Sequence, residues 1–340
     1  MSHSGFQAAM SILSHVYFAP ILGRLIRARV PDLLNGEAVH SSDLARQAGL
    51  HPLSVSRALR ALTAFGVFRE VAPGMFAHSE ASSLFRDAPG GLRNYALFAT
   101  SEQYLKSSAA LGQSLETGQA AHIHALGQSV WEYMRDHPED NAAFNRGLAE
   151  IRTDEQASIA AAYDWTGVTS VVDVGAGAGA LLASIVEGNP GVRGILFDRP
   201  DVLPDSDHLL TARGVRQRCE LVGGSFFEPM EVEGDVWILS QVLHDWPDAE
   251  CETILRRCSE RMRTGDRLLV VEMVPVPGQP DVGIALLDIA MMIFGGEARQ
   301  RTVEEYDALF GSTGFSPARV VETGTAFSVL ESRPSRGVTT

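Results

Sequence analysis

One histidine of this sequence stands where an enzyme could place a base. His244 follows an apolar segment, 236–239, whose composition predicts a buried strand. Glu272 ends the next such segment, 267–271. The carboxyl ends of parallel strands share the edge at which open α/β sheets bind ligands, so the two side chains should lie close together.

A histidine and a glutamate at that edge suit the removal of a proton from a hydroxyl group. A neutral phenol is a poor nucleophile, and histidine, with a reference pKa near ~6.5, can act as its general base at neutral pH. The carboxylate of Glu272 could accept the Nδ1–H of His244 and fix the tautomer of the ring. The alternative is a histidine that caps a helix or fills the core without any chemistry.

A glycine-rich turn predicts a cofactor site on the same sheet. The segment Gly175-Ala176-Gly177-Ala178-Gly179 joins a buried strand, 171–174, to a helix, 180–187. Glycines let the main chain approach a ligand closely, and the helix N-terminus offers free N–H groups. Asp198 ends the following strand, about 20 residues on, where an acid suits the hydroxyls of an adenosine ribose.

The turn by itself is compatible with more than one cofactor. Gly175, Gly177 and Ala180 satisfy the dinucleotide fingerprint G-x-G-x-x-G/A, so NAD is one alternative, and a turn that binds nothing is another. Asp173 favours S-adenosylmethionine (SAM), because an acid there repels a pyrophosphate but can hold the ammonium of an amino acid. The sheet also starts only near residue 170, and no hydride-transfer residues follow it.

The elements that must position these residues alternate in type along the C-terminal half. Five apolar segments with helices between them predict strands: 171–174, 194–197, 221–223, 236–239 and 267–271. Such near-continuous apolar strands predict a parallel sheet covered by helices on both faces. Phe327–Glu331 predicts a last strand, and Ser332–Thr340 a loose tail.

The first 100 residues have the pattern of a winged helix. Ser41-Ser42-Asp43 offers N-caps for a helix through Ala48, and His51-Pro52 opens a second helix. Two short strands, 67–71 and 75–77, flank a Pro-Gly turn. This pattern either binds DNA or serves as a structural and dimerisation module. The following residues, to about 164, are predicted to be helical, with one break at Asp136-His137-Pro138.

Composition restricts the partners. The 340 residues carry a net charge of −14, which argues against a dedicated nucleic-acid binder, because phosphate binding needs concentrated Lys and Arg. No segment reaches the roughly 18 consecutive apolar residues of a membrane helix, and the first 26 residues are predicted to form a packing or dimer helix. The sequence has three cysteines without a CxxC motif or a Cys/His cluster, so it predicts no metal site. So few cysteines favour the reducing environment of the cytoplasm, and we expect them to have no role.

Seven segments carry a resemblance that covers essentially the whole chain: VVDVGAGAG, FDRP, VGGSFFEP, LSQVLHDWPD, VVEMVP, LLDIAMM and RTVEEY. Together they resemble the plant-type (caffeate/hydroxyindole-like) small-molecule O-methyltransferases, in their bacterial natural-product branch. The resemblance implies a Rossmann-like class I methyltransferase sheet with SAM as cofactor and S-adenosylhomocysteine as product. It implies a winged-helix domain, 1–100, that forms a homodimer and closes the partner's pocket, a helical connector, 101–165, and a SAM-binding domain, 166–335.

Position by position, the resemblance also assigns contacts. With Asp173 from the argument above, the expected cofactor residues are Asp173, Gly175, Gly177, Asp198, Arg199, Gly224, Ser225, Phe226, Ser240 and Gln241. Asp198 is expected on the ribose, Gly224–Phe226 beside the adenine, and Ser240 near the sulfur. The expected acceptor residues are Trp131, Phe144, Leu148, Asp245, Met291, Met292 and Gln300. Their methionine and aromatic members suit a flat apolar acceptor, although such residues could equally be core.

Three positions depart from the family pattern. Ser225 stands where many relatives have Asp, and Ser240 stands where plant enzymes have Lys. Gln300 replaces a Glu that in many relatives precedes Arg-Thr and acts as a second orienting carboxylate. Gln cannot carry that charge, although Glu297 lies nearby in the sequence and could substitute for it.

We therefore expect a cytoplasmic enzyme, without a metal, that moves a methyl group from SAM to a phenolic hydroxyl of a small aromatic secondary metabolite. One alternative is an enzyme of the same fold that keeps SAM but hydroxylates, decarboxylates or performs a pericyclic reaction. The intact His244-Asp245-Trp246 segment with Glu272 favours methyl transfer over it. A second alternative, a ligand-responsive winged-helix regulator, is disfavoured by the acidic charge and the complete cofactor turn.

Overall fold

The computed structural model describes residues 3–335, apart from the side chains of residues 3–8, 11, 15 and 149–154. The chain forms two compact units by its internal contacts. The N-terminal unit comprises residues 1–109 and 125–152, and the C-terminal unit comprises residues 110–124 and 153–340. The domain boundaries expected near residues 100 and 165 stay a prediction.

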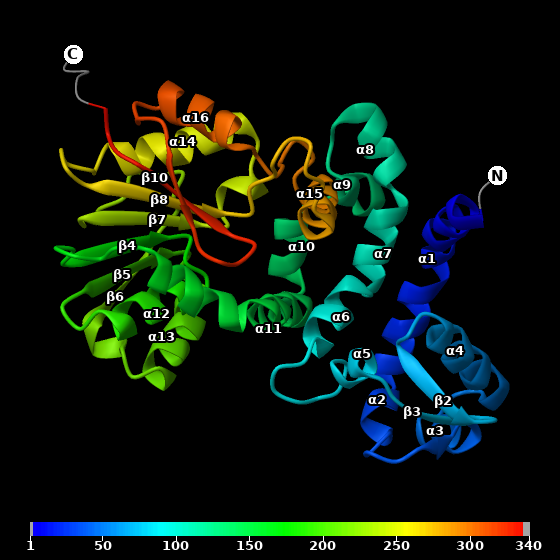
Figure 1. The fold of residues 1–340 in the computed structure, drawn as a ribbon. Coiled ribbons are helices and arrows are strands. Elements are labelled where there is room, and N and C mark those ends of the chain that lie inside the picture. The colour runs from blue at the N-terminus through cyan, green and yellow to red at the C-terminus, as the bar shows by residue number, and fades with distance from the viewer. Residues whose placement is uncertain (1–2, 336–340) are drawn as a thin grey trace. The chain divides into compact units, whose positions relative to one another are not determined.

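A seven-stranded sheet forms the centre of the C-terminal unit (Figure 1), in the order β6-β5-β4-β7-β8-β10-β9. Its strands are β4 (Ser170–Val174), β5 (Arg193–Asp198), β6 (Cys219–Gly223), β7 (Val236–Ser240), β8 (Arg267–Glu272), β9 (Arg319–Glu322) and β10 (Ser328–Ser332). The first five are parallel, as predicted, whereas β10 is antiparallel to both β8 and β9. The sequence did not predict β9, because this edge strand is mostly exposed and lacks an apolar pattern.

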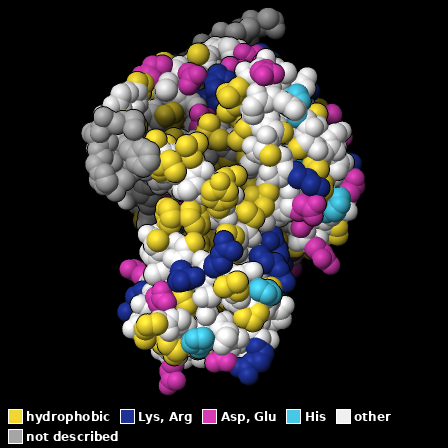
Figure 2. Space-filling view, turned by 90° about the vertical axis from the view of Figure 1, so that its right-hand side faces the viewer, with side chains coloured by type: hydrophobic (Ala, Val, Ile, Leu, Met, Phe, Trp, Pro, Cys, Tyr) yellow, Lys and Arg dark blue, Asp and Glu magenta, His cyan; other side chains and the backbone are white. Residues whose placement is uncertain are grey.

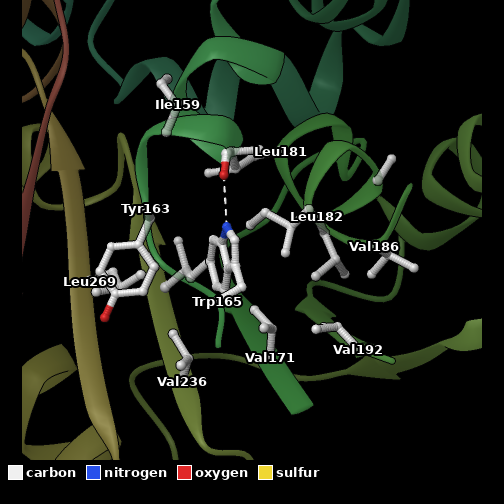
Figure 3. Packing of buried hydrophobic residues seen from close by; sticks show 14 of the residues in the cluster. Ile159, Tyr163, Trp165, Val171, Leu181, Leu182, Val186, Val192, Val236 and Leu269 are labelled. Atoms are coloured by element: carbon white, nitrogen blue, oxygen red, sulfur yellow. Dashed lines mark hydrogen bonds between the residues drawn. The ribbon is translucent and has the colours of Figure 1, made fainter. Parts of the chain in front are cut away.

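Helices cover both faces of this sheet (Figure 1), as expected for strands that are buried on both sides. One face packs on α12 (Ala180–Gly188), α13 (Leu203–Ala212) and the end of α11 (Pro138–Ala162), and the other on α14 (Asp248–Ser259) and α16 (Val303–Ser312). Neighbouring strand residues alternate between the two cores: Val171 lies in the first and Val172 in the second. In the first core, Trp165 lies among aliphatic side chains and donates its indole N–H to Ala160 O at 2.7 Å (Figure 3).

The strand order reverses at the place on the sheet edge where a ligand is expected. The chain moves outward from β4 to β5 and β6, then returns to place β7 on the other side of β4. Open α/β sheets bind ligands at the carboxyl ends of strands beside such a reversal. The glycine turn after β4 and the segment after β7, which carries His244, both lie at this edge.

The N-terminal unit begins with the predicted winged helix. Its elements are α1 (His3–Arg27), α2 (Val30–Leu33), β1 (Val39–His40), α3 (Ser41–Gln47), α4 (Pro52–Ala64), β2 (Phe68–Ala72) and β3 (Met75–His78). The N-cap of α3 was wrong in the prediction: His40 is the cap, and its ring accepts the Ser42 N–H, because Ser41 already lies inside the helix. His51 caps α4 with Pro52 in the first turn, as the sequence indicated.

The remaining helices are distributed over both units. They are α5 (Glu80–Ser83), α6 (Arg93–Ala99), α7 (Glu102–Ala109), α8 (Leu111–Thr117), α9 (Ala121–Leu126), α10 (Val130–Asp136), α15 (Val282–Phe294) and the short 3-10 turns η1 (Arg216–Arg218) and η2 (Leu243–Asp245). The predicted break between α10 and α11 is confirmed. Among the described residues, no helix combines the length and apolarity needed to cross a bilayer.

The predicted loose tail begins later than expected. Ser332 pairs with Leu268 in the sheet, and Pro334 forms a bridge with Phe315, so the prediction is wrong for these residues. Residues 336–340 of that tail lie outside the described part of the chain.

Helix α1 presents an apolar surface. Five of its large apolar side chains are between 48% and 74% exposed: Met10, Ile12, Leu13, Val16 and Tyr17. Figure 2 shows hydrophobic side chains gathered on one face of the molecule. Clusters of this kind on a protein surface mark places where another surface binds.

Candidate active site

The glycine turn has the conformation that its sequence predicted. Gly175, Gly177 and Gly179 have φ values of +72°, +56° and +82°, a region that other residues seldom adopt. A Cβ on Gly175 would lie 2.9 Å from Val242 Cγ2 and 3.4 Å from Phe226 Cε1. The turn therefore runs directly against the segment after β7 and against a predicted adenine-binding ring.

Asp198 is bonded to the same turn. Its Oδ2 accepts the Gly177 N–H at 2.7 Å, and its Oδ1 accepts the Arg199 N–H at 2.7 Å. Burial raises the pKa of Asp198, while these two hydrogen bonds oppose that rise. Arg199 bonds to Asp198 through its main chain, and its exposed guanidinium pairs with Asp201.

Asp173 is the most deeply buried acid of the turn. It is 1% exposed, and its Oδ1 has no hydrogen-bond partner among the described residues. Burial, and then the charge of Asp198, raise its pKa to about 7. A buried carboxylate oxygen without a donor is costly unless a ligand supplies one, which is what a bound ammonium group would do.

An aromatic group lies beside this turn. Phe226 and Phe227 have ring centroids 4.9 Å apart, and Trp246 lies 5.9 Å and 4.8 Å from them. The sequence pattern did not predict this packing of Trp246, which directly follows His244-Asp245 in the chain. Gly224 lets the chain pass close to Phe197, since a Cβ would lie 2.5 Å from that ring. Ser225 is exposed, and its hydroxyl accepts the Phe227 N–H at 3.3 Å.

The chain leaves β7 through a strained residue. Gln241, directly after Ser240, has φ +56°, which costs a non-glycine residue on the order of 1–2 kcal/mol. Its main-chain N–H donates to Val271 O at 2.9 Å, and its buried side-chain Oε1 has no partner among the described residues. Strain of this kind tends to occur at functional sites, so the observation supports the predicted role of Gln241.

His244 and Glu272 are brought together as the sequence predicted. The Nδ1 of His244 lies 2.6 Å from Glu272 Oε2, and the His244 backbone N–H donates to Oε1 at 3.3 Å. The histidine is 4% exposed and the glutamate is fully buried. On the other side of the ring, Nε2 lies 3.4 Å from Asp245 Oδ1. Two acidic groups therefore flank the imidazole, one beside each ring nitrogen.

The predicted acceptor residues fall into both units. Asp245, Met291, Met292 and Gln300 belong to the C-terminal unit with His244; Met291 is buried and Met292 half-buried. Gln300 is 5% exposed, and both polar atoms of its amide lack a partner among the described residues. Its backbone N–H donates to Asp288 at 2.8 Å.

Trp131, Phe144 and Leu148 lie in the N-terminal unit and are half-buried. The ring of Phe144 packs 4.8 Å from that of Phe98. Their participation in an acceptor pocket stays a prediction. Glu297, the possible substitute for a second orienting carboxylate, is exposed.

The described residues contain no group of three His, Cys, Asp or Glu side chains arranged to hold a metal. The three cysteines are all buried and free of disulfides. What the site offers is a glycine turn at a helix N-terminus, a buried acid with one oxygen that no described residue bonds, and a histidine held by a carboxylate.

Comparison with known proteins gives a consistent result. Residues 108–316 match the model of the O-methyltransferase domain, and residues 10–87 match that of the O-methyltransferase dimerisation domain. A phenazine O-methyltransferase of Lysobacter antibioticus is 35% identical, over 95% of this chain and 93% of the relative. A phenazine-1-carboxylate N-methyltransferase of Pseudomonas aeruginosa is 28% identical, over 90% of this chain and 89% of that one.

Solved structures agree with this result. The mitomycin 7-O-methyltransferase superposes with a TM-score of 0.92 at 30% identity and 98% coverage of both chains. An O-methyltransferase from neocarzinostatin biosynthesis, solved with SAM and 2-hydroxy-5-methyl naphthoic acid, has a TM-score of 0.80 at 28% identity, with 93% of this chain and 95% of that chain covered.

Proposed function

The chain belongs to the O-methyltransferase family and is a SAM-dependent enzyme, and from that premise we propose that it methylates a phenolic hydroxyl of a small aromatic compound with His244 as general base. The observation that carries the proposal is the 2.6 Å contact between His244 Nδ1 and Glu272 Oε2. A carboxylate can only accept a hydrogen bond, so the neutral ring must donate from Nδ1 and keep its lone pair on Nε2. Asp245 Oδ1 is the more distant acid, 3.4 Å from Nε2 against 2.6 Å between Nδ1 and Glu272, so we assign the proton to Nδ1 and proton abstraction to Nε2.

The residues present fit the cofactor. Asp173, with its unpartnered buried oxygen, would hold the ammonium group, and Asp198 would hold the ribose. Gly175 and Gly177 would let the main chain approach it, and Phe226 would lie beside the adenine. When bound, SAM supplies an electrophilic methyl group on a positively charged sulfur.

The chain's own residues then act on the acceptor. Nε2 of His244 would take the hydroxyl proton as the acceptor oxygen acquires the methyl group that SAM would supply, which leaves S-adenosylhomocysteine as the other product. Glu272 and Asp245 stabilise the imidazolium that results. Methyl transfer depends on the alignment of the acceptor with the methyl group and on the exclusion of water. The buried side chains of Met291 and Gln300 are therefore suited to line the acceptor site.

A second acceptor atom is supported by one of the relatives. The Pseudomonas enzyme is named as an N-methyltransferase, so an aromatic nitrogen is an alternative to a hydroxyl. A neutral ring nitrogen already offers its lone pair and needs no base. Activity on such an acceptor would therefore persist without His244, whereas activity on a phenol would not.

The experiment is a screen of aromatic phenols, matched aromatic amines and ring nitrogens with methyl-labelled SAM. We expect label in an O-methyl product together with S-adenosylhomocysteine. Binding of SAM without methylation of any phenol, or label only on nitrogen, would contradict the proposal. A hydroxylated or decarboxylated product without label would instead support the alternative chemistries of the same fold.

We also infer that the enzyme works as a homodimer through its N-terminal domain. The match of residues 10–87 to a dimerisation domain and the exposed apolar side chains of α1 support this assembly. A cytoplasmic location and the absence of nucleic-acid binding stay predictions from the sequence.

A further inference from the structure

Arg301 is fully buried next to the segment that carries His244. Its relative exposure is 0%, which is unusual because an arginine is almost never buried without partners. It lies just before the N-cap of α16, in the segment that follows α15. The established family activity assigns it no part, so its burial requires an explanation from its contacts.

The guanidinium spans the main chain on both sides of His244. Nη1 donates to Leu243 O at 2.8 Å, and Nη2 donates to Trp246 O at 2.7 Å. The Nε and Nη2 groups also donate to Asp248 Oδ1 at 3.0 Å and 2.8 Å. One side chain therefore fixes the carbonyl before His244, the carbonyl after Asp245, and the start of α14.

A buried thiol approaches the same two carbonyls. Cys251 Sγ lies 3.1 Å from Leu243 O and 3.3 Å from Trp246 O. Burial raises the pKa of this thiol to about 12, so it keeps its proton and can donate. This cysteine was expected to have no role. Together with Arg301 it donates to the Trp246 carbonyl and to the Leu243 carbonyl, which also accepts the Trp246 N–H at 3.3 Å within the 3-10 turn.

We call the bonds of Arg301 to Leu243 O, Trp246 O and Asp248 the Arg301 clamp. This clamp affects the pairing of His244 with Glu272. Glu272 is fixed in the sheet as the last residue of β8, whereas His244 lies in η2, outside any strand. Both hydrogen bonds of the pair, one to the ring and one to the backbone N–H, depend on where the main chain of η2 lies. Arg301 connects that main chain to Asp248 and thus to α14.

We propose that Arg301 is a positioning residue for proton abstraction, which holds η2 so that His244 stays bonded to Glu272 and its Nε2 stays directed at the acceptor. This inference rests on the proposed function of His244. Only a planar fork with several fixed donors can bond two carbonyls and a carboxylate at once. A lysine at this position would keep the charge but lose that geometry.

Arg301→Lys tests the inference, with Arg299→Lys as the matched control. Arg299 pairs with the same acid, Asp248, and with Glu305, but its guanidinium contacts neither carbonyl. We expect Arg301→Lys to lower kcat about 10–100-fold while the Kd for SAM and the KM for the acceptor change less than about 3-fold. Arg299→Lys should stay within about 2-fold of the unchanged enzyme in all three.

A spectroscopic signature separates positioning from general loss of structure. A proton shared between Nδ1 and a carboxylate 2.6 Å away should give a low-field proton resonance in the NMR spectrum. We expect that resonance to shift or broaden in Arg301→Lys and to be unchanged in Arg299→Lys. A folded Arg301→Lys enzyme with the original kcat, or with reduced kcat and an unchanged resonance, would overturn the inference.

Asp248→Ala decides the matter if Arg301→Lys does not fold. The Asp248 side chain is 52% exposed, so its loss should leave the fold intact while freeing one edge of the guanidinium. We expect the kcat of Asp248→Ala to be about 3–10-fold lower than that of Arg299→Lys. An unchanged kcat in Asp248→Ala would refute the inference. His244→Ala in the same assay distinguishes this inference from the proposed function. An active His244→Ala enzyme contradicts the proposed function. An inactive His244→Ala enzyme together with a fully active Arg301→Lys enzyme contradicts only the role of Arg301.

Discussion

The ring of His244 and its own backbone N–H are both bonded to the carboxylate of Glu272. Nδ1 lies 2.6 Å from Oε2, and the backbone N lies 3.3 Å from Oε1. The first contact fixes the tautomer, and the second fixes the main chain that carries the ring. A single buried acid thus determines both the orientation of the imidazole and the nitrogen that is left to accept a proton.

Glu272→Gln should therefore reduce catalysis more than it reduces binding. An amide offers only one accepting oxygen for two donors and places an NH2 group against the other. We expect kcat to fall about 10–10³-fold, with the Kd for SAM nearly unchanged, in steady-state kinetics and calorimetry. Glu231→Gln, at an exposed acid of the same unit, is the control and should behave as the unchanged enzyme. Equal activity of the two variants would show that the carboxylate at 272 does not support the base.

Asp173→Asn should have opposite effects on stability and on binding. Burial, and then Asp198, raise the pKa of Asp173 from 3.8 to about 7. The folded protein thus disfavours the charged form, so this group's contribution to stability is full below about pH 4 and is lost as the pH rises to about 7. At pH 8 we expect Asp173→Asn to raise the Tm of the cofactor-free protein and to weaken SAM binding.

The same residue predicts how SAM affinity depends on pH. A bound ammonium pairs with the ionised carboxylate, so affinity should decrease as the pH falls below about 7. In Asp173→Asn this dependence should disappear. Calorimetry between pH 5.5 and 8.5, about 1.5 units on either side of the Asp173 pKa, measures SAM affinity in the unchanged enzyme and in the variant. A variant that binds SAM as tightly as the unchanged enzyme at pH 8 would contradict the assigned role.

Gly175→Ala should destabilise the cofactor-free protein more than Gly177→Ala. Both residues have positive φ, which costs alanine about 1–2 kcal/mol. A Cβ on Gly175 would in addition lie 2.9 Å from Val242 Cγ2, whereas a Cβ on Gly177 would meet no atom within 4 Å. Urea unfolding of the two variants gives the comparison. Equal losses would mean that the turn does not pack on the segment after β7 as described.

Replacing Leu13 and Val16 together with Asp should separate the dimer. The two side chains are 68% and 69% exposed on α1, and charges there would remain unpaired in an apolar interface. Light scattering at micromolar concentration should show a monomer. Val320→Asp, at an exposed apolar residue of β9, should remain dimeric. A dimer of the double variant would locate the interface elsewhere.

The sequence predicted the elements whose residues carry a strong periodic or turn signal. The five parallel strands, the glycine turn and the proximity of His244 to Glu272 follow from apolar segments and from the geometry of parallel sheets. The comparisons decide for SAM over NAD, which the glycine fingerprint alone could not do.

Other features depend on contacts that no local pattern reveals. β9 is an exposed edge strand, and His40 caps α3 through its ring, which accepts the Ser42 N–H. The clamp of Arg301 on Leu243 and Trp246 joins residues more than 50 positions apart, so neither its burial nor the part of Cys251 could be read from spacing. The positive φ of Gln241 likewise accompanies a hydrogen bond from its N–H to Val271 on the neighbouring strand.

The most direct test of the account is methyl transfer by His244→Ala to a phenolic acceptor, measured as a single turnover with enzyme-bound labelled SAM. The account predicts that SAM binds as before and that the rate falls about 10²–10⁴-fold, because the phenol then has no base. It also predicts that the remaining rate increases as the pH approaches the acceptor's own pKa. A His244→Ala enzyme that binds SAM and methylates the phenol at the original rate would contradict the account.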